Sequence, residues 1–268
     1  MRFILCALVL VGCASAGTPS QSSRTLRVMT YNIQAGGGNI DRIGDAIRES
    51  GADVAALQEV DVHWSSRSSF VDEADSLAKY LKMNVRFADI YDLPPTDSSN
   101  SRRQFGVAVL SRYPIVAFTN HPITRLSTQS ANAAPAPAPG FLEASVDFHG
   151  TKIRVFTTHL DYRADPRVRE QQVRDMLGII GEAVTPTILF GDLNAAPDAP
   201  ELQPLFARLK DSWRSATGAG FSYPATNPEK RIDYVLTSRH FTARDARVPV
   251  TLASDHRPVI VDLELEHH

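Results

Sequence analysis

The chain has 268 residues, of which 43% are hydrophobic and 22% charged, and this predicts one globular domain or at most two small ones. Its 28 lysines and arginines are balanced by 30 aspartates and glutamates, so it lacks the overall positive charge of a strong nucleic-acid binder. No stretch reaches the roughly 18 apolar residues that a membrane-spanning helix needs. Both cysteines, Cys6 and Cys13, lie near the N-terminus, which excludes disulfides and thiolate metal sites from the rest of the chain.

The N-terminal residues have the pattern of an export signal. Arg2 precedes an apolar run at residues 3–11, so we interpret residues 1–12 as a signal peptide. The end of this run, Leu10-Val11-Gly12-Cys13, resembles the bacterial lipobox, whose cysteine is acylated; the small residues 14–16 would instead suit ordinary cleavage before Gly17. The lipobox explains the cysteine, so we expect lipidation at Cys13, a tether over residues 13–25 and a location in the bacterial cell envelope. Cleavage before Gly17 would give a secreted protein.

Residues 26–264 read as one domain without internal repeats. Apolar runs bounded by turn residues predict strands at residues 26–33, 53–60, 85–90, 105–111, 115–119, 141–148, 152–160, 187–191, 231–237 and 258–265. Apolar residues at helical spacing predict helices from Asn39 to Gly51 and over residues 71–81, 165–181 and 199–209. Residues 265–268 resemble an expression-tag remnant and are left out of the chemistry.

Two long segments between the predicted strands are rich in turn residues. Residues 92–103 carry prolines, serines and an asparagine, and residues 127–140 contain Pro135, Pro137 and Pro139. Prolines at that density predict extended backbone outside any sheet. Many strands with few helices between them predict an α/β (α+β) fold, in which mixed sheets carry helices on their outer faces.

Polar side chains recur where the predicted strands end. They are Asn32, Glu59, His159, Asp192, Asn194, Asp233, Asp255 and His256. Any one of them has an ordinary structural explanation as a cap, a solvated carboxylate or a hydrogen-bonded core histidine. As a set they supply carboxylate and amide oxygens, which suit Mg²⁺ or Mn²⁺, together with two histidines for acid–base chemistry or phosphate binding. Such a set can activate water and stabilise charge on a phosphoryl group.

The order of these residues resembles the endonuclease/exonuclease/phosphatase superfamily, which includes deoxyribonucleases, sphingomyelinases and inositol polyphosphate 5-phosphatases. The resemblance covers residues 26–264 and rests on seven ordered stretches: Thr30-Tyr31-Asn32-Ile33, Leu57-Gln58-Glu59-Val60-Asp61, Gly106-Val107-Ala108-Val109-Leu110-Ser111-Arg112, Thr158-His159-Leu160-Asp161, Gly191-Asp192-Leu193-Asn194, Arg231-Ile232-Asp233-Tyr234 and Ser254-Asp255-His256. It implies a four-layer sandwich of two mixed sheets, with helices outside and the site at one edge.

The same resemblance implies roles for the residues. Glu59 would be the main carboxylate for a Mg²⁺ ion, with Mn²⁺ as an alternative, and Asn32 and Asp255 would lie nearby. Asp192 and Asn194 would position the attacking water and the phosphate. His256, oriented by Asp233, would be either the general base or a phosphate ligand, and His159 would bind phosphate and help the leaving group.

Three functions follow from these implications. The first is a Mg²⁺-dependent hydrolase of a phosphate ester or phosphodiester, small or lipid-linked, acting as a monomer outside the cytoplasm and anchored to a membrane. The second is a secreted or surface nuclease, which the neutral charge balance does not favour, and the third is an inactive binding module.

One position departs from the apurinic endonucleases, another branch of the superfamily. That branch carries an aspartate two residues after the first asparagine of the motifs, and here the position is Gln34, which argues against a role in base-excision repair. Candidate contacts to an anionic substrate are Arg102, Arg103, Arg163 and Arg167.

Overall fold

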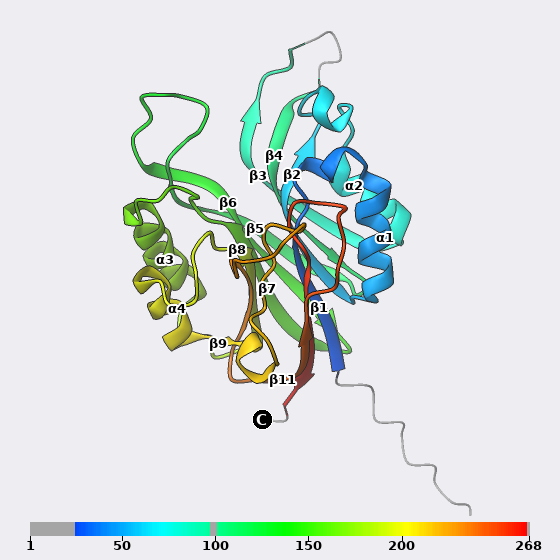
Figure 1. The fold of residues 1–268 in the computed structure, drawn as a ribbon, viewed down its shortest axis with the longest axis vertical. Helices are drawn as coiled ribbons and strands as arrows, with labels where there is room; N and C mark the ends of the chain where they lie inside the picture. The colour runs from blue at the N-terminus through cyan, green and yellow to red at the C-terminus, as the bar shows by residue number, and fades with distance from the viewer. Residues whose placement is uncertain (1–24, 97–100, 267–268) are drawn as a thin grey trace, which may run out of the picture.

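A computed structural model describes residues 25–96 and 101–266 and consists of two six-stranded sheets packed face to face (Figure 1). The first sheet has the order β11 (Phe241–Arg247), β12 (Val259–Leu265), β1 (Thr25–Asn32), β2 (Val54–Val62), β4 (Arg103–Ser111) and β3 (Asn84–Leu93). The second has the order β5 (Ile115–Arg125), β6 (Ala136–Phe148), β7 (Thr151–His159), β8 (Thr187–Asp192), β10 (Asp233–Thr237) and β9 (Lys210–Asp211). Each sheet contains one parallel pair, β1–β2 or β7–β8, so both sheets are mixed, as predicted.

Helices cover the outer face of each sheet and complete the four layers (Figure 1). The helices α1 (Ile40–Ser50) and α2 (Glu73–Leu81) pack on the first sheet, and α3 (Arg167–Ile180) and α4 (Gln203–Arg208) pack on the second. Asn39 begins α1 by accepting hydrogen bonds from two backbone amides, and Gly51 ends it at φ 68°, as the sequence indicated. A third apolar cluster lies between the sheets, where it contains strand residues such as Val28 and Phe190.

The proline-rich segment differs from its prediction. β6 begins at Ala136, and residues 136–138 pair with residues 123–125 of a β5 strand that is longer than predicted. The partner strand β7 first meets β6 at Leu142, so the other edge of this stretch is unpaired within the described residues. Proline lacks an N–H donor and is therefore tolerated in a strand that needs hydrogen bonds on one side alone. The prediction from proline content, that residues 136–140 lie outside any sheet, is therefore wrong.

The remaining boundaries differ by small amounts. β11 was not predicted, because it is a polar, partly exposed edge strand with a register irregularity. Thr25 and Leu265 both pair within the first sheet, so the paired strands extend one residue beyond each predicted end of the domain. The predicted signal peptide and Cys13, the predicted lipidation site, lie outside the described residues. None of the helices in residues 25–96 and 101–266 is long and apolar enough to cross a membrane.

Candidate active site

Strand register brings three of the predicted side chains into one row on the second sheet. His159 pairs with Asp192 across the parallel strands β7 and β8, and Asp192 pairs with Asp233 across the antiparallel strands β8 and β10. Residues opposite each other in a sheet present their side chains on the same face. His159 Nε2 therefore lies 3.5 Å from Asp192 Oδ2.

His256 joins this row from the loop before β12. Its Nδ1 lies 2.8 Å from Asp233 Oδ2, which also accepts a 2.5 Å hydrogen bond from Ser222 Oγ, and its Nε2 lies 3.7 Å from Asp192 Oδ2. The Tyr223 ring packs beside the imidazole with the two centroids 4.7 Å apart. The predicted orientation of His256 by Asp233 is thus present in the geometry.

Asn32 connects the two sheets at the site. It ends β1 in the first sheet, and its Nδ2 donates to Glu59 Oε1 at 3.0 Å and to Asp192 Oδ2 at 3.1 Å. Its Oδ1 accepts from the backbone amide of Gln34 at 3.1 Å. One buried amide therefore fixes the distance between the Glu59 carboxylate of the first sheet and the Asp192 carboxylate of the second.

Glu59 lies on a bulge rather than at a strand end. The pairing of β2 with β4 shifts between Leu57 and Val60, and Glu59 has φ 56°. A left-handed backbone costs a residue other than glycine about 1 kcal/mol or more, and such strain concentrates at functional sites. The bulge breaks the two-residue alternation, which the sequence analysis had assumed when it placed Glu59 on the face of Leu57. It turns the carboxylate toward Asn32.

A buried carboxyl supports the chain just after this bulge. Glu73, at the start of α2, is 1% exposed, and its Oε2 accepts a 2.8 Å hydrogen bond from the backbone amide of Asp61. The Asp61 side chain is itself held by two hydrogen bonds from Arg67. Burial raises the pKa of Glu73 to about 8. A group on α2 thus anchors the strand beside Glu59.

Because the pKa of Glu73 is higher in the folded chain than in the unfolded one, the free energy of unfolding is expected to fall as the pH rises from about 4.5 to about 8. Glu73→Gln keeps an acceptor for the Asp61 amide without this titration. We expect the variant to unfold at least about 5 °C above the wild type at pH 9 and at a similar temperature at pH 4.5. Thermal unfolding of both proteins at the two pH values measures this, and an equal pH dependence would contradict it.

The site combines acidic and basic groups whose pKa values are shifted by burial and by one another. Burial and the neighbouring Asp233 charge raise the pKa of Asp192. Burial lowers the pKa of His256, but Asp233, Asp192 and Asp255 outweigh it and raise the pKa to about 10. Burial also raises the pKa of Asp255, and the Glu59 charge adds to that shift. His256 is therefore a cation at neutral pH with a proton on Nε2, whereas Asp192 is a stronger base than an exposed aspartate.

A divalent cation has suitable ligands on the first-sheet side. Glu59 and Asp255 are close enough to affect each other electrostatically, and both are carboxylates that are only partly buried. Asn32 presents its Nδ2 to Glu59, so its oxygen would have to turn to join them. Ligand atoms of Asp192, Asp233 and His256 also lie within 4.8 Å of one another, and the buried Asp233 Oδ1 has no hydrogen-bond partner within the described part of the chain. His256 Nδ1 already bonds to Asp233, so we favour Glu59 and Asp255 as the ligands.

Asn194 follows β8 in a left-handed conformation, with φ 50°. Its backbone amide donates to Asp192 Oδ1 at 2.9 Å, and its Nδ2 donates to the Leu160 carbonyl at 3.0 Å. The residue therefore joins Asp192 to the loop after His159.

The four candidate arginines are placed differently. Arg163 lines a pocket next to the site and bonds to Asp161. Arg102 bonds to Asp92, and Arg103 bonds to the Pro94 carbonyl, so both belong to the outer part of the β3–β4 hairpin. Arg167 forms an exposed ion pair with Asp165. The structure brings Arg163 to the pocket and leaves the other three away from its lining.

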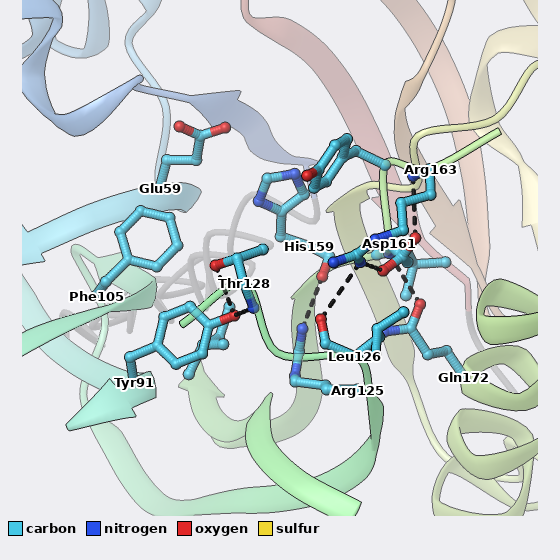
Figure 2. A pocket seen from close by; sticks show the side chains of 13 residues that line it. Glu59, Tyr91, Phe105, Arg125, Leu126, Thr128, His159, Asp161, Arg163 and Gln172 are labelled. Carbon is cyan, nitrogen blue, oxygen red and sulfur yellow. Dashed lines mark hydrogen bonds and ion pairs between the residues drawn. The ribbon is translucent and has the colours of Figure 1, made fainter. Parts of the chain in front are cut away.

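The pocket beside the site has a volume of about 210 Å³ (Figure 2). Glu59 and His159 belong both to its lining and to the site, while Tyr91, Phe105 and Arg125 are lining residues to which the sequence analysis gave no role. Phe105 begins one of the predicted strands and Tyr91 lies one residue beyond another, and neither carries a motif that would mark it as a pocket residue. Arg125 lay in a segment that was not predicted to be a strand.

The comparisons with known proteins agree with this arrangement. A model of the Endonuclease/Exonuclease/phosphatase family, whose members are divalent-metal-dependent hydrolases of phosphate esters, matches residues 29–256. No curated protein matches the chain. An endonuclease/exonuclease/phosphatase from Beutenbergia cavernae DSM 12333 is 27% identical, with 90% of this chain and 72% of that chain covered and a TM-score of 0.73.

Two other solved structures show the same fold at lower identity. The human Nocturnin catalytic domain with bound sulfate is 20% identical, with 91% of this chain and 96% of that chain covered and a TM-score of 0.66. Sphingomyelinase C from Streptomyces griseocarneus is 20% identical, with 89% and 99% covered and a TM-score of 0.61. The family match includes every predicted site residue from Asn32 to His256, and the two-sheet architecture agrees with it. The chain belongs to the Endonuclease/Exonuclease/phosphatase family.

Proposed function

We propose that the chain is a metal-dependent phosphoesterase that hydrolyses a small or lipid-linked phosphate ester or phosphodiester with an activated water. The observation that carries this proposal is the pair of hydrogen bonds from Asn32 to Glu59 and to Asp192. They hold a carboxylate suited to a metal next to a buried carboxylate suited to proton transfer, and two histidines flank the second one.

The metal would be held by Glu59 and Asp255, and Mg²⁺ is the proposed ion because these ligands are hard oxygens. Such an ion, when bound, neutralises negative charge on the phosphoryl group. The chain's own contribution is to fix the ligands: the bulge orients Glu59, and Ser254 Oγ donates to Asp255 Oδ1 at 3.3 Å and to the Asn32 carbonyl at 2.8 Å.

Proton transfer would be divided between Asp192 and the histidines. Asp192, with its raised pKa, accepts the proton of the attacking water, while His256 donates from Nε2 to a phosphoryl oxygen. The water oxygen forms a bond to phosphorus as the ester P–O bond breaks, and His159 is placed to give a proton to the departing oxygen. Of the two roles open to His256, its charge at neutral pH favours phosphate binding over that of a general base.

The candidate substrate-binding arginines favour a small substrate over duplex nucleic acid. Arg102, Arg163 and Arg167 each bond to a neighbouring aspartate, so their charge is largely neutralised. A protein that covers six to ten DNA phosphates needs many uncompensated cations, and it loses roughly a thousandfold or more in affinity as salt rises to physiological levels. One phosphoryl group needs only the metal, the two histidines and Asn194.

Competition at physiological salt tests the substrate class. The purified protein with Mg²⁺ is offered duplex DNA together with phospholipid, inositol-phosphate or sugar-phosphate substrates, and a chelator provides the metal-free control. We expect metal-dependent release of phosphate or headgroup, with kcat/KM for the preferred ester at least about tenfold above that for DNA. A preference for DNA that weakens steeply with salt would instead identify a nuclease. No turnover of any ester would favour the inactive binding module.

A further inference from the structure

The pocket beside the site lies where the organic part of a bound phosphate ester would extend. Glu59 and His159 lie at the boundary between the pocket and the catalytic cluster, and Figure 2 shows both above the cavity. A phosphoryl group bound by His159 and by a metal ion at Glu59 would therefore direct its ester oxygen toward this cavity. The volume of about 210 Å³ is below the roughly 300 Å³ at which pockets for drug-sized ligands begin, so it suits a single ring.

One wall of the pocket is aromatic. Tyr91 of β3 and Phe105 of β4 are paired residues on adjacent strands, and their rings are stacked with centroids 6.2 Å apart. The buried Ile90 also lines this side. The Tyr91 hydroxyl is hydrogen-bonded to Thr128 Oγ1 at 3.0 Å and to the Thr128 backbone amide at 2.9 Å, so a contact with the segment between β5 and β6 fixes the ring.

The opposite wall carries polar side chains next to Leu126 (Figure 2). Arg163 and Asp161 bond to each other there, and the Asp161 backbone amide donates to Gln172 Oε1 at 2.9 Å. Arg125 adds a guanidinium that donates to the His159 carbonyl at 3.0 Å and to the Gly140 carbonyl at 2.8 Å. Burial lowers its pKa to about 10, so it remains a cation at neutral pH. This wall therefore offers donors and acceptors side by side.

An apolar wall facing a mixed donor–acceptor wall matches a ring with hydroxyl groups. Each hydroxyl both donates and accepts, so it can bond to Arg163 and Asp161 at the same time, while the C–H face of the ring packs on Tyr91 and Phe105. A quaternary ammonium group fits less well, because Arg67 already lies over the Phe105 ring, with its guanidinium carbon 5.5 Å from the ring centroid.

We propose that Tyr91, Phe105, Thr128 and Arg163 form a subsite that selects phosphate esters of a hydroxylated six-membered ring, a sugar or cyclitol. The subsite rests on the proposed function, because it takes the alcohol half of the ester whose phosphate is hydrolysed. Phe105 and Thr128 act on substrate affinity and not on the chemical step.

The test compares two monoesters, a hexose 6-phosphate and glycerol phosphate, with Mg²⁺ at neutral pH. For the wild type we expect kcat/KM to be at least about tenfold higher for the hexose ester. Phe105→Ala is expected to raise KM for the hexose ester about tenfold with kcat little changed, and to leave glycerol phosphate unaffected. Thr128→Val is a milder variant, since the backbone amide of Thr128 still bonds to Tyr91, and it should reduce the preference by several-fold.

Phe118→Ala, an exposed ring on β5, is the matched control and should leave both esters unchanged. Thermal unfolding of each variant shows whether it is folded, and the Thr128→Val result decides the matter if Phe105→Ala does not fold. Equal kcat/KM for the two esters in the wild type, or equal losses for both esters in the variants, would overturn the subsite while leaving the phosphoesterase intact. Calorimetric binding of the hexose ester to the Asp192→Asn variant gives a readout that does not depend on turnover. If the wild type hydrolyses neither ester but the hexose ester still binds, the proposed function fails and the subsite stands.

Discussion

Replacing Glu59 by alanine is expected to lower kcat/KM by about a thousandfold or more, because the variant loses the carboxylate proposed to hold the metal. A metal ion that stabilises the transition state by about 4 kcal/mol accounts for a loss of that size. Glu59→Gln keeps an oxygen that can accept the hydrogen bond from Asn32 Nδ2. Its activity should therefore be partly recovered at high Mg²⁺ concentration.

Both Glu59 variants are expected to fold like the wild type, since the side chain is only partly buried and lies on the bulge. Metal titrations of activity, run on chelator-treated protein, measure the effect. Glu49→Gln, at an exposed position on α1, is the matched control and should behave like the wild type. Wild-type turnover by Glu59→Ala in chelator would show that neither Glu59 nor a metal is needed.

The second large effect concerns the residues around the attacking water. Asp192→Asn and His256→Ala are each expected to lower kcat by about a hundredfold to ten-thousandfold, the usual range for a group that transfers a proton or stabilises charge. His159→Ala should be comparably damaging, because its Nε2 lies 3.5 Å from the same Asp192 oxygen.

The double variant distinguishes a shared step from independent ones. Asp192 and His256 lie in one row with Asp233 and would act on one transition state, so the double variant should lose little more than the worse single variant. Single-turnover rates at saturating substrate for the four proteins give the comparison. A loss equal to the product of the two single losses would rule out joint action.

The sequence determined which residues were candidates, because local pattern carries that information. Apolar alternation placed Asn32 and His159 at strand ends, and the turn after β8 located Asp192 and Asn194. The helix α1 was predicted from its cap and its terminal glycine, which are interactions within a few residues. The two mixed sheets followed from the resemblance of the ordered motifs and are confirmed by the strand pairing.

Only the tertiary structure decided how these residues meet, because strand pairing is set by residues far apart in the chain. The register of β7, β8 and β10 aligns His159, Asp192 and Asp233, and Asn32 reaches Asp192 across 160 positions of sequence. Strand register also explains the two wrong predictions, for residues 136–140 and for the face on which Glu59 lies. A long-range pairing with β5 places the prolines of residues 136–140 in a strand, and an insertion in the β2–β4 ladder turns Glu59 away from its expected face. The stacked pair of Tyr91 and Phe105 becomes a pocket wall because residues 125–128 and 159–163, which are distant in sequence, line the same pocket.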